Sequence, residues 1–187
     1  MQDFNSTRRG FLLGAVAVPA LSVAACARAA DKPAPVAADV EIETFSAAGV
    51  STGVAKVARV VKTDEAWRKQ LSDLSFQVTR KAGTERPFTG EYTDNHADGL
   101  YRCICCETAL FDSKNKFDSG TGWPSFWKPL SNVNVAETAG GSHMWGTEVH
   151  CLRCNAHLGH VFDDGPRPTG LRYCINSVAI DFKPRGA

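Results

Sequence analysis

Apolar and polar positions follow three different patterns along the 187-residue chain. The first pattern is a single apolar run from Phe11 to Ala25, the only stretch of the sequence that approaches the roughly 20 residues needed to span a bilayer. The second covers residues 31–61, where Ala, Val and Pro are frequent. The third begins at residue 62, where short apolar segments are separated by Gly, Asp, Asn and Pro, as in a folded domain.

The first element predicted in the third region is a helix over residues 64–74. Thr63 can cap its first turn through the side-chain oxygen, and two acidic residues follow near the positive end of the helix dipole. Trp67, Leu71 and Leu74 are spaced at i, i+4 and i+7, so they form one apolar face.

Short strands are predicted after a turn-rich stretch at residues 83–90. Their segments are rich in aromatic and β-branched residues, and the turn residues between them indicate antiparallel pairing through hairpins and loops. Repeated alternation of strands with helices is absent from the sequence, which argues against a parallel doubly wound sheet. The predicted strands cover residues 99–103, 108–111, 147–151, 158–162 and 171–181.

Residues 31–61 are predicted to form an extended linker. Pro33 and Pro35 disfavour a helix, and the surrounding composition is typical of an extended spacer. Apolar and polar residues alternate between Val40 and Phe45. This alternation is compatible with a strand but is too short to predict one.

Residues 1–30 have the order of a secretory signal: charged residues, then apolar residues, then small residues. Arg8 and Arg9, followed by Phe11-Leu12, resemble a twin-arginine signal. The alternative is a buried or anchoring helix. Polar residues on both flanks and Pro19 inside the apolar run argue against it.

The sequence offers two alternative sites at which this signal could be processed. Val23-Ala24-Ala25-Cys26 resembles a lipobox, in which Cys26 would carry lipid and become the mature N-terminus. Ala27-Arg28-Ala29 offers an ordinary small-x-small cleavage site. The lipobox is favoured, so we expect an exported protein, either in the periplasm or attached by lipid to a membrane and facing the periplasm.

Composition and charge exclude several classes of protein. Hydrophobic residues make up 43% and charged residues 22%, as in an ordinary globular domain. The formal net charge is +1, with 21 basic and 20 acidic residues. Removing residues 1–25 takes away two arginines and one aspartate, which leaves 19 of each sign and a net charge of zero. The mature chain therefore has no electrostatic reason to bind nucleic acid.

Four cysteines form two C-x-x-C pairs, Cys103 with Cys106 and Cys151 with Cys154, separated by 44 residues. Each such turn can present two thiolates to one tetrahedral ion, so the sequence predicts a closed structural zinc site. The alternative is two disulfides, which an exported protein could form. Cys105 lies between two of these residues; it could replace a ligand or act in redox chemistry, but a passive, small apolar role is favoured.

Cys174 stands apart from these pairs. If it lies on a strand, Arg172 and Asn176 point to the same face, where the arginine charge would favour a thiolate and the asparagine amide could orient a ligand. These residues alone leave a catalytic thiol and a buried core cysteine as competing interpretations.

Four further motifs accompany the cysteine pairs in a fixed order. Together, the motifs resemble the B-type peptide-methionine (R)-S-oxide reductase family over residues 62–182. The resemblance implies a mainly β domain, over residues 62–187, of two antiparallel sheets with a few short flanking helices, held together by the four-cysteine zinc site. The motifs are GTERPFTGEY (residues 83–92), FDSGTGWPSF (117–126), AHLGHVF (156–162) and RYCINS (172–177).

The resemblance implies that Cys174 attacks the sulfur of the R epimer of methionine sulfoxide, free or in proteins, and becomes a sulfenic acid. It places zinc remote from the reaction. A sulfoxide must be protonated or strongly hydrogen-bonded before a thiolate attacks, and a histidine suits that role. By the same mapping, the pocket residues are His157 and His160 as candidate proton donors, Trp123 for the S-methyl group, and Asn176, with Arg172 beside them.

Recovery of the oxidised thiol requires a reductant. Many relatives carry a second cysteine in the segment that matches Ser119 to Gly122, where this chain has Thr121. Either Cys105 resolves the sulfenic acid or an external thioredoxin-like dithiol does, and we expect the external route and a monomeric enzyme. The rivals are a non-catalytic zinc-knuckle binding module and a thiol–disulfide oxidoreductase; the first leaves the export signal unexplained, and the second lacks its βαβ pattern.

Overall fold

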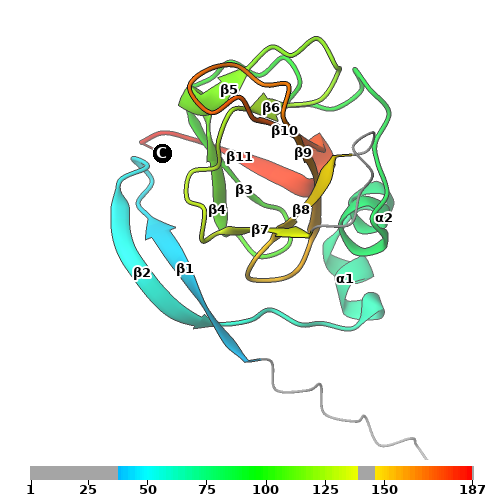
Figure 1. Cartoon of the computed structure of the whole chain (residues 1–187). Coiled ribbons are helices and arrows are strands. Elements are labelled where there is room, and N and C mark those ends of the chain that lie inside the picture. The colour runs from blue at the N-terminus through cyan, green and yellow to red at the C-terminus, as the bar shows by residue number, and fades with distance from the viewer. Residues whose placement is uncertain (1–37, 139–145, 187) are drawn as a thin grey trace, which may run out of the picture. The chain divides into compact units, whose positions relative to one another are not determined.

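The computed structural model describes residues 38–138 and 146–186 (Figure 1). The predicted signal and its candidate lipobox at Cys26 lie outside the described residues. Within the described ranges, no helix is both long enough and apolar enough to cross a membrane.

The described chain is mainly β, and every strand pairing in it is antiparallel. One sheet has six strands in the order β5-β6-β10-β9-β8-β7, a second has three in the order β11-β3-β4, and β1 pairs with β2. The predicted mainly β, antiparallel fold is therefore confirmed, although the sheets number three rather than two. The elements are β1 (Asp39–Phe45), β2 (Ser51–Ala58), α1 (Asp64–Gln70), α2 (Asp73–Lys81), β3 (Gly99–Cys103), β4 (Ala109–Asp112), η1 (Ser113–Asn115), β5 (Lys116–Phe117), β6 (Ser125–Phe126), β7 (Val135–Thr138), β8 (Thr147–Cys151), β9 (His157–Phe162), β10 (Arg172–Ile175), η2 (Ser177–Ala179) and β11 (Ile180–Pro184).

The third sheet lies where an extended linker was predicted, so that prediction is wrong for residues 39–58. Ile42, at 4% exposed, is the one residue of β1 that is fully buried. The buried Asn134 side chain accepts from Glu43 N and donates to Glu43 O, both at 2.8 Å. Most of β2 is exposed, which explains why its sequence carries no strong apolar periodicity.

The predicted helix over 64–74 is two helices. Leu71 has extended backbone angles, and the Ser72 hydroxyl accepts from Ser75 N at 3.1 Å, which starts α2. Leu74 therefore does not extend the apolar face of Trp67 and Leu71, and its side chain is 49% exposed. A serine side chain that competes for backbone donors stops one helix and caps the next.

The predicted strand over 171–181 is also divided. Its first part, β10, belongs to the six-stranded sheet, and its last part continues into β11 of the three-stranded sheet. Between them, the buried Glu85 carboxylate accepts from Ser177 N at 2.7 Å and from Val178 N at 3.0 Å. These bonds take backbone donors out of strand pairing and form η2 instead.

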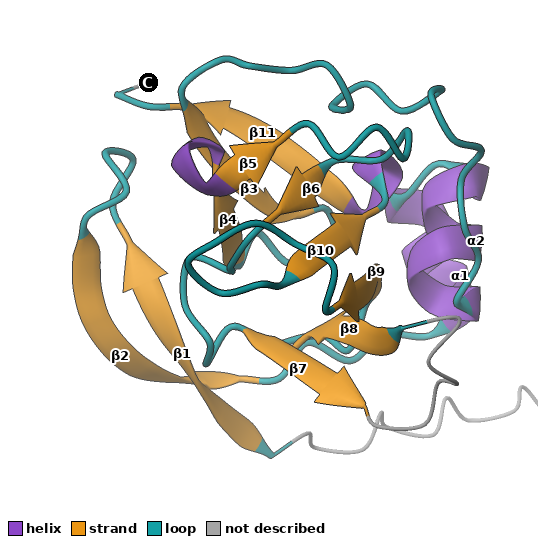
Figure 2. Ribbon diagram, turned by 45° about the horizontal axis from the view of Figure 1, so that its top comes forward, coloured by secondary structure: helices purple, strands orange, loops and turns teal. Residues whose placement is uncertain are grey.

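Aromatic side chains link the two larger sheets. Phe111 and Phe126 stack with ring centroids 4.5 Å apart, and Tyr101 meets Phe126 edge to face at 5.1 Å. All three side chains are fully buried. Both ribbon views place α1 and α2 on one side of these sheets and the β1–β2 hairpin on the other (Figures 1 and 2).

Candidate active site and candidate metal centre

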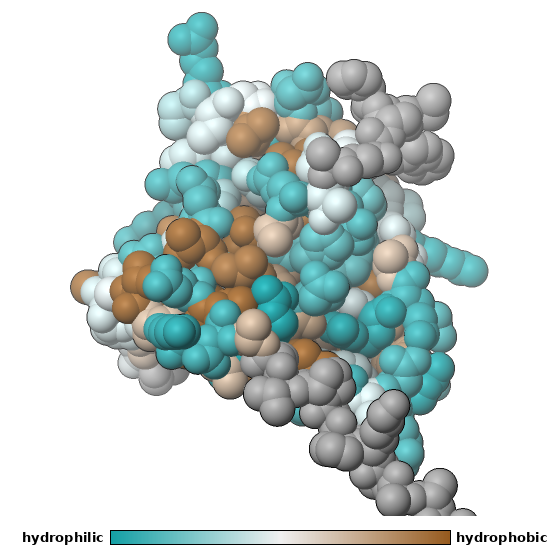
Figure 3. Space-filling view, turned by 60° about the horizontal axis from the view of Figure 1, so that its bottom comes forward, coloured by the Kyte–Doolittle hydropathy of each residue, from teal (hydrophilic) through white to brown (hydrophobic). Residues whose placement is uncertain are grey.

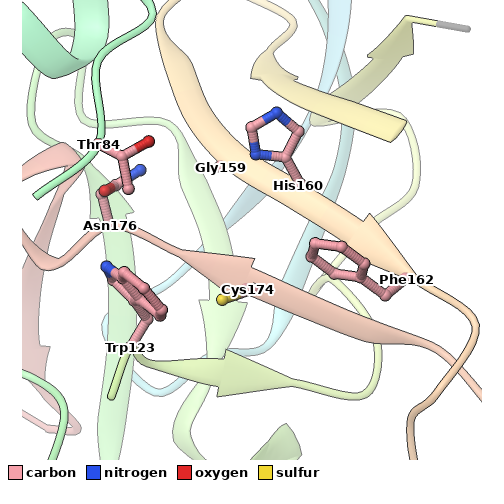
Figure 4. Close-up of a pocket in the computed structure, with 7 residues that line it drawn as sticks. All are labelled: Thr84, Trp123, Gly159, His160, Phe162, Cys174 and Asn176. Atoms are coloured by element: carbon pink, nitrogen blue, oxygen red, sulfur yellow. The ribbon is translucent and has the colours of Figure 1, made fainter. Parts of the chain in front are cut away.

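A pocket of about 280 Å³ opens beside β9 and β10. Close up, the Cys174 thiol lies between the ring of Trp123 on one side and the ring of Phe162 on the other, with His160 on the neighbouring strand (Figure 4). The pocket therefore combines one thiol, one imidazole and two aromatic walls. Its lining residues are Thr84, Trp123, Gly159, His160, Phe162, Cys174 and Asn176.

Strand pairing fixes the thiol and the imidazole. Cys174 is the cross-strand partner of His160 on β9 and of Ser125 on β6, so Cys174 occupies the centre of a three-strand segment. Gly159 allows this close approach, because a Cβ there would lie 2.1 Å from Cys174 O. Thr121 Oγ1 is 3.9 Å from Cys174 Sγ.

A hydrogen-bonded loop positions the other wall of the pocket. Trp123 Nε1 donates to Glu85 O at 3.1 Å, and Glu85 N donates to Asn176 Oδ1 at 3.0 Å. Asn176 Nδ2 donates in turn to Leu158 O at 3.0 Å. The buried Asn176 amide thus joins the Glu85 loop to β9, and the indole is held by the same loop.

The Cys174 thiol is not the low-pKa thiol that the sequence suggested. Burial raises its pKa above the ordinary cysteine value, and the neighbouring Arg172 charge opposes that shift only in part. Arg172 is buried and does not line the pocket. Its guanidinium donates to both carboxylate oxygens of Asp164 at 2.8 Å and stacks 4.3 Å from the ring centre of Phe162. Because Asp164 takes up much of its charge, Arg172 favours the thiolate less than expected.

The two histidines occupy different environments. His160 lines the pocket, and burial lowers its pKa, with a smaller contribution from the nearby His157. His157 is only 3% exposed and does not line the pocket. Its Nδ1 lies 2.6 Å from Glu148 Oε1, while its Nε2 has no partner. Burial lowers its pKa, although Glu148 opposes the shift.

The four paired cysteines converge at a second site. Their sulfur atoms all lie within 4.8 Å of one another, with Cys103 Sγ 3.6 Å from Cys154 Sγ and Cys106 Sγ 3.5 Å from Cys151 Sγ. Four thiolates about 2.3 Å from a tetrahedral ion would stand about 3.8 Å apart, so the arrangement fits a metal. Disulfide sulfurs lie about 2.05 Å apart. All six described cysteines are free thiols, so the disulfide alternative is wrong.

The two halves of this cluster have the same local geometry. Cys103 N donates to Thr108 O, and Cys151 N donates to Ala156 O. In each half, the residue after the second cysteine has a positive φ and donates its N–H to the first cysteine carbonyl at 2.9 Å (Glu107 and Asn155). The first half joins β3 to β4 and the second joins β8 to β9, so a bound ion would connect the two larger sheets.

Cys105 is buried beside this cluster, with its thiol next to Cys103, Cys154 and Thr79. Its carbonyl accepts from Gln70 Nε2 at 3.0 Å, which fixes the turn. Cys105 is neither a member of the four-sulfur group nor a residue of the Cys174 pocket.

The structure thus brings together Cys174, His160, Trp123 and Asn176 and leaves His157 and Arg172 behind the pocket wall. Thr84, Gly159 and Phe162 also line the pocket, although they were not predicted as site residues from the sequence. Phe162 follows His160 by two positions on a strand, so side-chain alternation alone places both on one face. Thr84 and Gly159 lie inside two of the motifs, but no local pattern indicates that they reach the pocket.

The sequence comparisons agree with this geometry. Residues 71–184 match the SelR domain family. A peptide methionine sulfoxide reductase MsrB of Pseudomonas entomophila (strain L48) is 58% identical over 128 residues, which cover 68% of this chain and 98% of the relative. The same-named protein of Hahella chejuensis (strain KCTC 2396) is 56% identical over 125 residues, covering 66% and 90%. That of Thioalkalivibrio sulfidiphilus (strain HL-EbGR7) is 58% identical over 122 residues, covering 65% and 89%.

Proposed function

The chain belongs to the SelR (MsrB) family of methionine sulfoxide reductases, and from that premise we propose that it reduces the R epimer of methionine sulfoxide at Cys174. One observation carries the proposal. A single thiol, separate from the four-cysteine cluster, lies in a pocket between two aromatic side chains and beside an imidazole (Figure 4). Substrates are oxidised methionine residues in peptides and proteins, or the free amino acid.

The first step transfers one oxygen atom. Cys174 Sγ attacks the sulfoxide sulfur, the S–O bond breaks, and oxygen ends on Cys174 as a sulfenic acid that carries the proton of the original thiol. The cysteine sulfur is oxidised by two electrons, and the substrate sulfur is reduced by two. The product is methionine, and no external reductant enters at this stage.

Four of the pocket residues, and two residues behind the pocket wall, have a part in that step. Trp123 and Phe162 contact the S-methyl group and the side-chain methylenes. His160 donates a hydrogen bond to the sulfoxide oxygen, which makes the sulfur electrophilic. Asn176 holds the Glu85 loop, and through it Trp123, in place. Arg172 stabilises the thiolate from behind the pocket wall, and His157 supports His160, whose ring centre is 5.3 Å away.

Recycling uses an external thioredoxin-like dithiol. Thr121 stands where many relatives carry the second cysteine; its Oγ1 is 3.9 Å from Cys174 Sγ, and it has no thiol to offer. Cys105 is buried at the metal cluster, so its movement to Cys174 would disturb the ligand turn. The donor's first thiol displaces the sulfenic oxygen as water, and its second thiol releases Cys174 and forms the donor's own disulfide.

The four-cysteine cluster binds one zinc ion with a structural role. Four thiolates in closed tetrahedral geometry are the ligand set that zinc prefers, and they leave no open position for substrate. Cys103, Cys106, Cys151 and Cys154 hold the ion, which fixes the two larger sheets to each other and takes no part in oxygen transfer.

The protein is exported by its twin-arginine segment and acts as a monomer in the periplasm, or attached there by lipid on Cys26. The residue order of positions 1–30 supports this proposal. Mass spectrometry of the mature protein tests it. A lipidated N-terminal Cys26 is expected, whereas an intact Met1 would contradict export.

A steady-state assay tests the reaction, with the two sulfoxide epimers supplied separately and a thioredoxin-type donor present. The wild type is expected to reduce only the R epimer. Cys174→Ser is expected to lose at least about a thousandfold in rate with unchanged zinc content, while Cys105→Ser turns over normally. Retained activity in Cys174→Ser would contradict the proposed nucleophile, and lost turnover in folded, zinc-loaded Cys105→Ser would contradict the external route.

A further inference from the structure

Phe88 combines two features that folding alone does not favour. Its side chain is 71% exposed, so its ring buries little apolar surface within the domain. Its backbone has a φ of 62°, in the left-handed region that glycine and asparagine tolerate far better than a bulky aromatic residue. A strained residue with a solvent-exposed aromatic ring indicates that the ring serves an interaction outside the fold.

The surrounding loop holds Phe88 in this conformation from both sides. On one side, the buried Glu85 carboxylate accepts from Ser177 N and Val178 N, which fixes the loop on η2. On the other, Phe88 N donates to Gly122 O at 2.8 Å. Phe88 is therefore presented by a tightly bonded loop, not by a loose one.

The same bonds place Phe88 at the rim of the Cys174 pocket. A Cβ on Gly122 would meet the Phe88 ring at 2.8 Å, so the ring lies against that glycine. Gly122 is directly preceded by Thr121, which contacts Cys174, and directly followed by Trp123, which lines the pocket. The exposed Phe88 ring thus lies against the short segment that carries both Thr121 and Trp123 to the pocket.

The size of the pocket determines what lies outside it. About 280 Å³ accommodates one methionine side chain, and the polypeptide on either side of that residue must cross the rim. An exposed aromatic ring offers that polypeptide an apolar contact at low cost in side-chain entropy.

We propose that Phe88 is a substrate subsite that contacts an apolar side chain close to the oxidised methionine in a peptide or protein. This inference rests on the proposed reductase function and adds a preference to it. Oxidised methionines next to apolar residues, as in the exposed cores of unfolded or damaged proteins, become the favoured substrates, and free methionine sulfoxide gains nothing from Phe88.

The test compares three substrates in the R configuration. They are N-acetylmethionine sulfoxide methylamide, a peptide with leucine on both sides of the sulfoxide, and the same peptide with serine in place of leucine. The variants are Phe88→Ala and Phe88→Gly, and Leu74→Ala is the matched control, because Leu74 is an exposed apolar residue on α2. A chemical dithiol replaces the protein donor, so that donor docking does not enter the measurement.

The wild type is expected to favour the leucine peptide over the serine peptide. Phe88→Ala is expected to lower kcat/KM for the leucine peptide about five- to tenfold, mainly through KM, and to leave the blocked amino acid unchanged. Phe88→Gly should show the same kinetics with an equal or higher Tm, because glycine relieves the left-handed strain. A purely structural role predicts a lower Tm instead.

Two results would overturn the subsite. Equal losses of kcat/KM on all three substrates would mean that Phe88 only positions the Trp123 loop. No loss on any substrate would mean that the Phe88 ring contacts no substrate; a ring that serves only to dock the protein donor would give this second result. A wild type that reduces none of the three would refute the reductase proposal itself, which is a separate outcome.

Discussion

At the residue scale, the reactivity of Cys174 depends on opposing effects on one thiol pKa. Burial raises it, Arg172 lowers it and Asp164 raises it, with burial the largest cause. The resting enzyme therefore holds Cys174 mainly as a thiol at neutral pH, which protects it from unspecific oxidation. A sulfoxide bound in the pocket supplies both the electrophilic sulfur and the oxygen that accepts the thiol proton.

Alkylation of Cys174 by iodoacetamide as a function of pH measures this balance. In the wild type, the rate is expected to rise with a midpoint above the free-cysteine value of about 8.5. Arg172→Leu removes a cation that favours the thiolate, so the midpoint should rise further and the rate at pH 8 should fall about tenfold per pKa unit. Asp164→Asn should act in the opposite direction. An unchanged midpoint in Arg172→Leu would exclude an electrostatic role for this side chain.

At the element scale, the sequence predicted best those strands that end at a cysteine of a C-x-x-C turn. The strand over 99–103 is β3 and that over 147–151 is β8, and each ends at the first cysteine of a C-x-x-C turn. The sequence failed where a distant residue decides the local structure. Glu85 divides the predicted strand over 171–181, and Asn134 holds a hairpin whose own residues are mostly exposed. Such long-range contacts leave no local periodicity to detect.

The candidate site, like the strands, was predicted from the sequence only in part. Motif resemblance identified Cys174, His160, Trp123 and Asn176, which the structure brings to one pocket. It also grouped His157 with them, although a carboxylate on the adjacent strand holds that ring behind the pocket. Burial and ion pairing depend on the packed structure, so the pKa of Cys174 could not be derived from Arg172 alone.

Asn134 provides a test of how the hairpin is attached. Its fully buried amide donates to Glu43 O and Ala109 O at 2.8 Å and accepts from Glu43 N. Asn134→Ala leaves these backbone groups without partners, so the free energy of unfolding should fall by about 2–4 kcal/mol. Urea denaturation measures the change, and Asn132→Ala, at an exposed position, is the matched control. A loss below about 0.5 kcal/mol would show that the hairpin is attached by other contacts.

At the scale of the whole molecule, the four-cysteine cluster connects the β3–β4 and β8–β9 turns of different sheets. Structural zinc sites bind with about 10–16 kcal/mol, and a domain of this size is stable by about 5–15 kcal/mol. Loss of the proposed ion would therefore remove most of the stability of the fold, although none of the four cysteines lines the Cys174 pocket.

Cys103→Ser is expected to abolish stoichiometric metal binding and to unfold the domain at ordinary temperature. Metal analysis together with far-ultraviolet circular dichroism measures both effects, and a strong chelator should produce the same loss in the wild type. Cys105→Ser is the control, because Cys105 is outside the four-sulfur group. A folded, metal-free Cys103→Ser protein with normal Tm would refute the structural role.

The most direct test of Cys174 as the site of oxygen transfer is a single turnover without reductant. Equal amounts of protein and the R epimer of N-acetylmethionine sulfoxide methylamide are mixed, and a dione reagent traps any sulfenic acid. One sulfide product per protein molecule is predicted, with the trap on Cys174 alone and no reaction of the S epimer. Product formed while Cys174 stays unmodified, or formed by the Cys174→Ser variant, would contradict the account.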